Sequence, residues 1–311
     1  RRQIACAAMS PRLVSVGNII VDLLATVPAL PVRGGDVLAT DSSIAPGGAF
    51  NALLAAVRQG LPAAYAGGHG AGFFGNLVRS TLDAVGIEAL LPAATDRDTG
   101  YDIALIDAEG ERTFVTVFGA EAELTVASLE TLVVRPDDLV HVSGYGLLPT
   151  TNADVLTPWL EAFQTSNTAL LDPGPLVADI QPSVWAVARN RADWLSCNKR
   201  EAAILTGRAD AREAIGILSR TSRGVLIRLG ADGCLLALDG AVEHLAGFPV
   251  APVDTNGAGD AHCGAFLAGL AATLSPSDAA VRANACAAIA TTRRGPATAP
   301  TLAEVEAFLG Q

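Results

Sequence analysis

The stretch Val253–Leu270, VDTNGAGDAHCGAFLAGL, places a glycine-rich turn and a charged residue directly before a run of small apolar residues. The turn Gly257-Ala258-Gly259 leads into a predicted apolar helix that begins near Asp260. Free N–H groups at the start of a helix, together with the positive end of its dipole, attract an anion. Glycines let a phosphate approach the backbone closely, because no Cβ intervenes. The stretch therefore predicts an anion pocket.

Asp260, at the mouth of this helix, has two interpretations. A carboxylate beside a phosphate pocket can accept the proton of an attacking hydroxyl group, which typically contributes about 10²–10⁴-fold to a rate. The local field is expected to lower the pKa of Asp260, so that this base acts by its position. The alternative is that Asp260 is only a helix N-cap and that the glycines form a tight turn.

The composition excludes several classes of protein. A chain of 311 residues, 50% of them apolar, can bury one large or two modest cores. The net charge of −11 leaves no basic footprint for a nucleic-acid or membrane partner. No apolar run approaches the ~20 residues of a membrane span. The five cysteines show no CxxC pair, which favours a reducing cytoplasm without disulfides or zinc. Lys199 is the only lysine, so no P-loop is present.

Strand and helix patterns alternate over roughly 200 residues, which predicts an α/β protein with a mostly parallel sheet covered on both faces. The first strand pattern runs from Leu13 to Val16 and resumes as far as Asp22. Two β-rich segments, 31–45 and 99–119, do not fit the alternation and are expected to form a smaller unit; the second predicts a hairpin that turns at Gly110. Residues 12–311 are therefore expected to form one domain after a disordered lead, residues 1–11.

Several motifs appear in the order typical of one family. They are DTNGAGD (254–260), GNIIVD (17–22), GGAFN (47–51), NKRE (198–201), RLGADG (228–233) and AIATTRRGPATAP (288–300). Together, from about residue 13 to 309, these motifs resemble those of the ribokinase-like (PfkB) carbohydrate kinases. Within that family the chain resembles bacterial sugar kinases of unassigned substrate. The family usually has threonine where Asn256 stands.

The resemblance implies a three-layer α/β/α ribokinase-like fold with a small β-rich lid formed by segments 31–45 and 99–119. It implies ATP-dependent phosphoryl transfer, with Mg²⁺, to a hydroxymethyl group of a sugar or sugar acid. Such transfer asks mainly for positioning and charge stabilisation, and a lid keeps water from accepting the phosphoryl group. In some relatives the lid is also a homodimer interface, which would explain exposed apolar residues at Phe114, Val117 and Phe118.

The resemblance also implies a role for each residue that matches a family motif. Asp260 would be the base, and the amides of Gly257, Ala258, Gly259 and Asp260 the anion hole. The substrate hydroxyls would be held by Asp22, Gly47, Gly48 and Asn51. The nucleotide side would comprise Asn198, Glu201, Arg228, Gly230 and Asn284, with Glu201 organising Mg²⁺ through water. A potassium ion would be held, mainly by backbone oxygens, at Asp254, Asn256, Ala290, Arg293 and Gly295.

The residue pattern alone leaves several of these roles open. Asp22 and Asp172 each end an apolar strand, where ligands of such sheets bind, and Asp172 is expected to have a supporting role. Asn51 follows two glycines at a predicted helix start, so capping is its alternative.

Two further positions have a structural alternative. Asn198 and Glu201 have the spacing of a capping box. Arg112 would either meet a substrate carboxylate or phosphate, or be a solvated charge on the hairpin.

Three other functions compete with a sugar kinase. A nucleoside or pseudouridine kinase of the same fold would need aromatic rings to stack a base; the candidates are Phe50, Tyr101, Phe114 and Phe118. A non-catalytic family member would bind a sugar without turnover, which the intact GAGD sequence disfavours. A nicotinamide dehydrogenase is disfavoured because no G-x-G-x-x-G follows the first strand.

Overall fold

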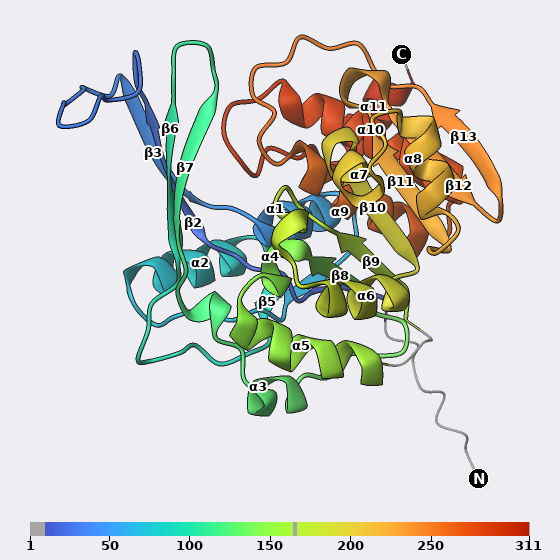
Figure 1. The fold of residues 1–311 in the computed structure, drawn as a ribbon, viewed down its shortest axis with the longest axis horizontal. Helices are drawn as coiled ribbons and strands as arrows, with labels where there is room; N and C mark the ends of the chain where they lie inside the picture. Colours follow the sequence, from blue (N-terminus) through green and yellow to red (C-terminus); the bar gives the residue numbers. More distant parts are fainter. Residues whose placement is uncertain (1–9, 164–166, 311) are drawn as a thin grey trace.

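The body of the protein is a nine-stranded sheet, seen in a computed structural model that describes residues 10–163 and 167–310 (Figure 1). The strand order is β13-β12-β11-β10-β9-β8-β1-β4-β5. Strands β11 to β5 run parallel, and β12 and β13 are added antiparallel at one edge. The bounds are β1 Leu13–Ser15, β4 Ala63–Tyr65, β5 Glu88–Ala89, β8 Leu139–Ser143, β9 Ala169–Asp172, β10 Trp194–Asn198, β11 Gly224–Arg228, β12 Cys234–Leu238 and β13 Ala241–Leu245. The predicted lead, residues 1–11, lies mostly outside the described residues.

Helices cover both faces of this sheet, each over its own hydrophobic cluster. The first cluster lies under α1 Ala49–Arg58, α2 Phe73–Ala84, α9 Ala258–Ala271, α10 Pro276–Thr291 and α11 Leu302–Leu309. The second lies under α3 Val126–Glu130, α4 Gly144–Leu147, α5 Thr150–Ala162, α6 Pro182–Arg191, α7 Lys199–Thr206 and α8 Ala211–Leu218. The predicted α/β class, with three layers and a mostly parallel sheet, is confirmed.

A smaller sheet of four strands, in the order β3-β2-β6-β7, projects from the body (Figure 1). Its strands are β2 Val21–Thr26, β3 Asp41–Pro46, β6 Tyr101–Ile106 and β7 Arg112–Val117. The β2–β6 pair is parallel, and the β2–β3 and β6–β7 pairs are antiparallel. The β6–β7 hairpin turns, as predicted, at Gly110, whose φ of 82° suits glycine.

The start of the smaller sheet differs from the prediction. The first core strand, β1, ends at Ser15, and the chain then crosses to the smaller sheet, where β2 begins at Val21. The break at Gly17-Asn18 is therefore a change of sheet and not an interruption within one strand. In the described parts of the chain, no helix combines the length and apolarity that a membrane crossing requires.

Candidate active site

Helix α9 presents unpaired amides at its first turn. Gly257 is the N-cap, with φ 72°, and the helix begins at Ala258, two residues before the predicted start. The amides of Gly257, Gly259 and Asp260 have no acceptor within the described residues, whereas the amide of Ala258 donates to the carbonyl of Thr255 at 3.3 Å. Three of the four predicted amides are therefore open to an anion.

Asp260 lies in this first turn and is held by Asn51 of α1. Nδ2 of Asn51 donates to Oδ2 of Asp260 at 3.3 Å, and Oδ1 of Asn51 accepts the amide of Ala297 at 2.9 Å. The N-caps of the two helices are Gly48 and Gly257, and neither helix has a side-chain cap. The capping alternatives for Asn51 and Asp260 are therefore wrong.

The pKa of Asp260 moves in the opposite direction to the prediction. Burial raises it to about 7, and the charge of Asp172 adds to this rise, while Asn51 and Arg228 oppose it. The predicted lowering is wrong because desolvation of the carboxylate and repulsion by a buried neighbour outweigh the local field. A carboxylate with a pKa near neutrality suits a general base.

The two predicted sugar-binding segments, 17–22 and 47–51, lie side by side. The amide of Gly47 donates to the carbonyl of Ile20 at 2.9 Å. A Cβ on Gly47 would collide with the carboxylate of Asp22, and one on Gly48 would collide with the carbonyl of Asn18. Gly48 also has φ 60°, so position 48 requires glycine, whereas a side chain at position 47 would displace the Asp22 carboxylate.

Asp22 is the second residue of β2 and not, as predicted, the end of a strand of the main sheet. Its register partner on β6 is Asp102, a residue that the sequence analysis did not single out. Burial, followed by the charges of Asp102 and Asp260, raises the pKa of Asp22 to about 8. Burial alone raises the pKa of Asp102 to about 6. The charge at position 102 of an otherwise apolar strand was the available signal for this second carboxylate.

Arg228 connects the nucleotide side to the anion pocket. Strands β9 and β11 lie on either side of β10. Because both run in the same direction, their last residues, Asp172 and Arg228, come together at one edge of the sheet. Nη1 of Arg228 lies 3.0 Å from Oδ2 of Asp172 and 2.7 Å from Oγ of Ser196, and Nη2 lies 3.5 Å from Oε2 of Glu201. A Cβ on Gly259 would lie 3.3 Å from the same Nη2, so the guanidinium borders the start of α9.

Asn198 and Glu201 form the capping box that their spacing predicts. The amide and Nδ2 of Asn198 each donate to the Glu201 carboxylate at 2.7 Å, and the amide of Glu201 donates back to Oδ1 of Asn198 at 2.9 Å. Burial and the charge of Asp172 raise the pKa of Glu201. Burial is the largest influence on Asp172 and would raise its pKa, but Arg228, the amide of Gly174 and His141 together lower it.

Two other predicted nucleotide residues lie outside this cluster. Asn284 donates to the carbonyls of Leu245 and Ala246, both at 3.2 Å, and its Oδ1 lies 3.2 Å from Nε2 of His262. It therefore fixes the segment after β13. Gly230, with φ 66°, stands in the loop after β11, where an added Cβ would meet open space.

Arg112 forms an ion pair that joins the smaller sheet to the body. Its guanidinium contacts Oδ1 of Asp254, in the segment before α9. The Asp254 carboxylate also accepts the amides of Asn256 at 2.8 Å and Gly295 at 3.0 Å. The alternative that Arg112 is a solvated hairpin charge is wrong.

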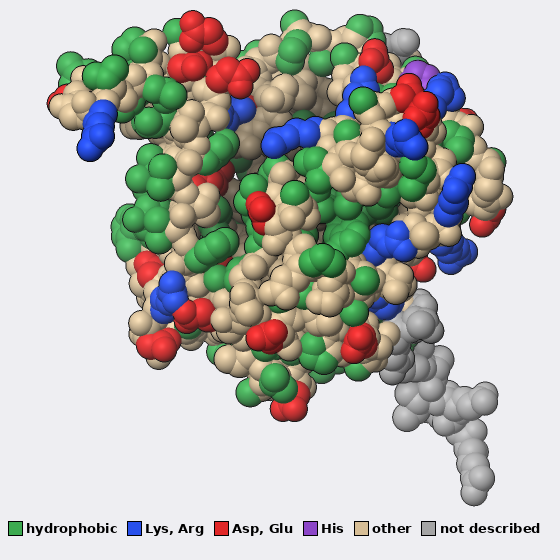
Figure 2. All heavy atoms as spheres, in the orientation of Figure 1, with side chains coloured by type: hydrophobic (Ala, Val, Ile, Leu, Met, Phe, Trp, Pro, Cys, Tyr) green, Lys and Arg blue, Asp and Glu red, His purple; other side chains and the backbone are tan. Residues whose placement is uncertain are grey.

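A cavity of about 240 Å³ lies between the smaller sheet and the body. Its lining includes Leu24, Thr26, Ile106, Arg112, Asp254 and Gly295. Figure 2 shows the surface hollowed between these two parts of the molecule.

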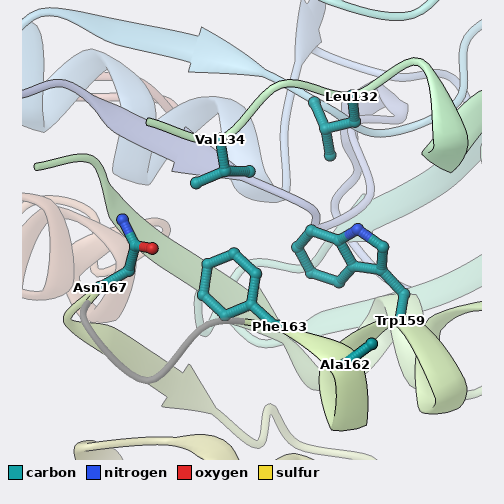
Figure 3. Close-up of a pocket in the computed structure, with 6 residues that line it drawn as sticks. All are labelled: Leu132, Val134, Trp159, Ala162, Phe163 and Asn167. Atoms are coloured by element: carbon teal, nitrogen blue, oxygen red, sulfur yellow. The ribbon is translucent and has the colours of Figure 1, made fainter. Parts of the chain in front are cut away.

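A second cavity, of about 230 Å³, lies at the end of α5 (Figure 3). Its lining contains none of the predicted site residues and consists of Leu132, Val134, Trp159, Ala162, Phe163 and Asn167. The first hollow is lined by two predicted potassium residues, Asp254 and Gly295, and by none of the predicted catalytic, substrate or nucleotide residues.

Tyr145, which follows β8 and is 37% exposed, is a candidate site residue that the sequence analysis missed. Partial desolvation, and next the charges of Asp260 and Asp102, raise its pKa to about 12. Its hydroxyl group therefore stands in the field of carboxylates from both the body and the smaller sheet. Its position directly after a strand of the parallel sheet was the signal that could have found it.

Comparison with known proteins places this geometry in one family. The sequence pattern of the pfkB family carbohydrate kinases matches residues 10–302. The chain belongs to this family. PfkB sugar kinases are ATP-dependent phosphotransferases, so the protein is a carbohydrate kinase.

Individual relatives agree with this assignment. The PfkB chain is 33% identical to the "Uncharacterized sugar kinase YegV" of Escherichia coli K12, over 93% of its own length and 91% of the relative. Its fold is similar to that of Arabidopsis thaliana ribokinase complexed with ribose and ATP (TM-score 0.79, 22% identity, 97% and 100% coverage). It is also similar to a ribokinase-type E. coli structure with ATP and Mg²⁺ (TM-score 0.81, 22% identity, 96% and 99% coverage).

Proposed function

We propose that this PfkB kinase transfers the γ-phosphoryl group of ATP to a hydroxymethyl group of a sugar, with Asp260 as the general base. The observation that carries the proposal is the position of Asp260: a half-buried carboxylate with a pKa of about 7, oriented by Asn51, beside three unpaired amides. Asp22, Gly47 and Gly48 lie next to it on the substrate side.

The proposed reaction assigns a separate task to each part of the site. Asp260 takes the proton of the hydroxyl group as its oxygen attacks phosphorus, and Asn51 keeps the carboxylate in place. The amides of Gly257, Gly259 and Asp260 receive the charge on the transferred group. The smaller sheet acts as a lid that excludes water.

ATP and Mg²⁺ fit the residues at the ends of β9 to β11. When bound, Mg²⁺ neutralises phosphate charge, and it usually keeps several waters and needs only one or two carboxylates. The described residues contain no cluster of three or more metal-ligating side chains, which suits a metal that arrives with the nucleotide. We assign Glu201 to hold it through water, and Arg228, Gly230, Asn198 and Asn284 to the nucleotide side.

A potassium site fits the predicted ligand residues only in part. The carbonyl of Ala290 already accepts the amide of Arg293 at 3.2 Å and the hydroxyl of Thr298 at 3.0 Å. Arg112 supplies the positive charge beside Asp254. We therefore route no step of the proposed reaction through potassium. A kcat that is unchanged when tetramethylammonium replaces K⁺ in the assay would agree with this, and a lower kcat would support the predicted potassium site.

The outer face of the smaller sheet is proposed as a homodimer interface. Ile44, Ile103 and Val115 form one exposed row across the strands, and Val117 lies on the same face. Phe114 belongs to the opposite face, together with Asp102. Light scattering should give twice the chain mass, and Ile103→Lys should reduce it to a monomer.

An ATP-consumption screen over sugars, sugar acids and nucleosides tests the proposed function. We expect turnover of a sugar, with Asp260→Asn lowering kcat by about 10²–10⁴-fold. Asp83→Asn, at an exposed position on α2, is the matched control and should keep full activity. Near wild-type turnover by Asp260→Asn would refute the base assignment. Sugar binding without any phosphorylation would instead favour a non-catalytic member.

Two of the four candidate rings for a nucleoside base are already packed in the protein. Phe50 is only 3% exposed in the core, and Tyr101 packs on Phe74 with ring centroids 5.2 Å apart. Phe114 and Phe118 are 49% and 39% exposed. The ribose of a nucleoside also carries uncharged hydroxyl groups, as another sugar does. Nucleosides therefore enter the screen as competitors.

A further inference from the structure

Two buried carboxylates of the smaller sheet have no hydrogen-bond donor among the residues that the structure describes. Asp22 and Asp102 are register partners on the parallel strands β2 and β6, so their side chains lie on one face of the sheet. They are 6% and 7% exposed, and neither accepts a hydrogen bond within the described residues. Oδ1 of Asp102 is fully buried and unpartnered.

Burying two carboxylates costs free energy of folding unless a hydrogen-bond donor reaches them. Leaving a buried polar group unpaired costs about 1–3 kcal/mol, and a charged group costs more. Buried polar atoms without a hydrogen-bond partner are rare in native structures. We therefore expect a donor from outside the chain, such as a ligand hydroxyl group or a water molecule, to bind each carboxylate. The Asp22 carboxylate packs directly against Gly47, where an added Cβ would collide with both of its oxygens.

No neighbour neutralises the pair. Asp260 and the Tyr145 hydroxyl face it from the body, and Asp102 and Asp260 both raise the pKa of Asp22 after burial has done so. Arg112 opposes that rise, but its own ion pair is with Asp254. The wall of the site is therefore acidic.

We propose that Asp102 is a specificity-determining residue that, with Asp22, binds two hydroxyl groups of an uncharged sugar and rejects sugar acids and sugar phosphates. This inference rests on the proposed kinase function and deepens it. O–H donors to carboxylates form short, strong hydrogen bonds, so a vicinal diol satisfies both groups. An anionic substrate would place like charges together, and its carboxylate or phosphate group has no proton to donate to Asp22 or Asp102.

The test compares uncharged aldoses, ketoses and polyols with the matching sugar acids and sugar phosphates. Each is measured by calorimetric binding and by ATP consumption. For the wild type we expect kcat/KM at least about 100-fold higher for the best uncharged sugar than for its acid. Asp102→Asn and Asp102→Ala should raise KM for that sugar about 10-fold, with a smaller change in kcat. Both variants should also lower the ratio of kcat/KM for the sugar to kcat/KM for its acid at least about 10-fold.

Glu109→Gln removes the same charge from the exposed hairpin tip and is the matched control. It should leave the preference unchanged. Tighter binding of a sugar acid or phosphate by the wild type would overturn the inference, as would an unchanged preference in both Asp102 variants. Because binding is measured separately, selective binding of uncharged sugars without phosphorylation would refute the kinase function and leave the specificity inference standing.

Discussion

The Nδ2 atom of Asn51 lies 3.3 Å from Oδ2 of Asp260, so a residue of α1 holds the first charged side chain of α9. The other end of the Asn51 amide accepts the amide of Ala297, which fixes which atom faces the carboxylate. Asn51 therefore positions the proposed base, in addition to its predicted contact with substrate.

Asn51→Ala should lower kcat about 10–100-fold, because the carboxylate loses its orientation. It should also move the rising limb of the pH–rate profile to higher pH, since Asn51 lowers the pKa of Asp260. The measurement is kcat from pH 5.5 to 9. Asn190→Ala, on the exposed side of α6, is the control. A variant with reduced kcat and an unmoved limb would contradict the positioning role.

The wild-type rate should rise with pH through about 7, because Asp260 must lose its proton to act as a base. In Asp260→Asn the residual rate should lose this limb. The profile is recorded with saturating ATP and sugar. A limb that persists in Asp260→Asn belongs to another group and would remove Asp260 from this role.

Arg112→Ala should loosen the attachment of the smaller sheet to the body, because the ion pair with Asp254 is one of its links to the body. KM for the sugar should rise, and proteolysis of the 107–111 hairpin should accelerate. A double-mutant cycle with Asp254→Ala should give a coupling free energy of about 0.5–3 kcal/mol. Additive effects of the two substitutions would show that the pair does not couple. The neighbouring, exposed Glu111→Ala is the control.

Arg228→Met should lower the free energy of unfolding by about 3–5 kcal/mol, since it leaves the buried Asp172 and Glu201 without their cation. Adding Asp172→Asn should restore part of this loss. Urea denaturation measures both. The matched control is Arg223→Met, whose side chain is 74% exposed. Equal losses in the free energy of unfolding for Arg223→Met and Arg228→Met would refute the claim that the buried ion pairs of Arg228 stabilise the fold.

Asp22→Asn should stabilise the protein at pH 8 by about 1–3 kcal/mol while weakening sugar binding. The pKa of Asp22 rises from 3.8 to about 8 on folding, so the folded state keeps a proton that the unfolded chain releases. Stability contributed by this proton is present below about pH 4 and is lost as the pH rises to 8. Thermal melts from pH 4 to 9 should show this slope in the wild type and a reduced slope in the variant. Asp41→Asn, exposed on β3, should behave as the wild type.

The sequence predicted the parallel body and the hairpin because those features depend on local patterns. Alternating strands and helices specify the first, and a positive-φ glycine between two alternating runs specifies the second. It placed Asp22 in the wrong sheet because an apolar strand has the same pattern in either sheet. A chain that changes sheets at Gly17-Asn18 shows only a turn at that point.

The errors at the site have a common physical origin. The pKa of Asp260 depends on its burial and on Asp172, which lies 88 positions earlier in the chain. The partner of Asp22 is Asp102, brought close only by strand pairing. Desolvation and long-range charge are properties of the folded molecule, so no local motif contains them.

The crossing from β1 to β2 puts Asp22, the proposed sugar-binding carboxylate, and Asp260, the proposed base, on different parts of the molecule. Under the proposed function, a sugar that binds Asp22 and Asp102 would add contacts between the smaller sheet and the body that a water molecule does not make. The nucleotide alone would leave the acceptor position unassembled. A kinase built in this way would hydrolyse little ATP in the absence of sugar, because the sugar is the ligand that completes the site.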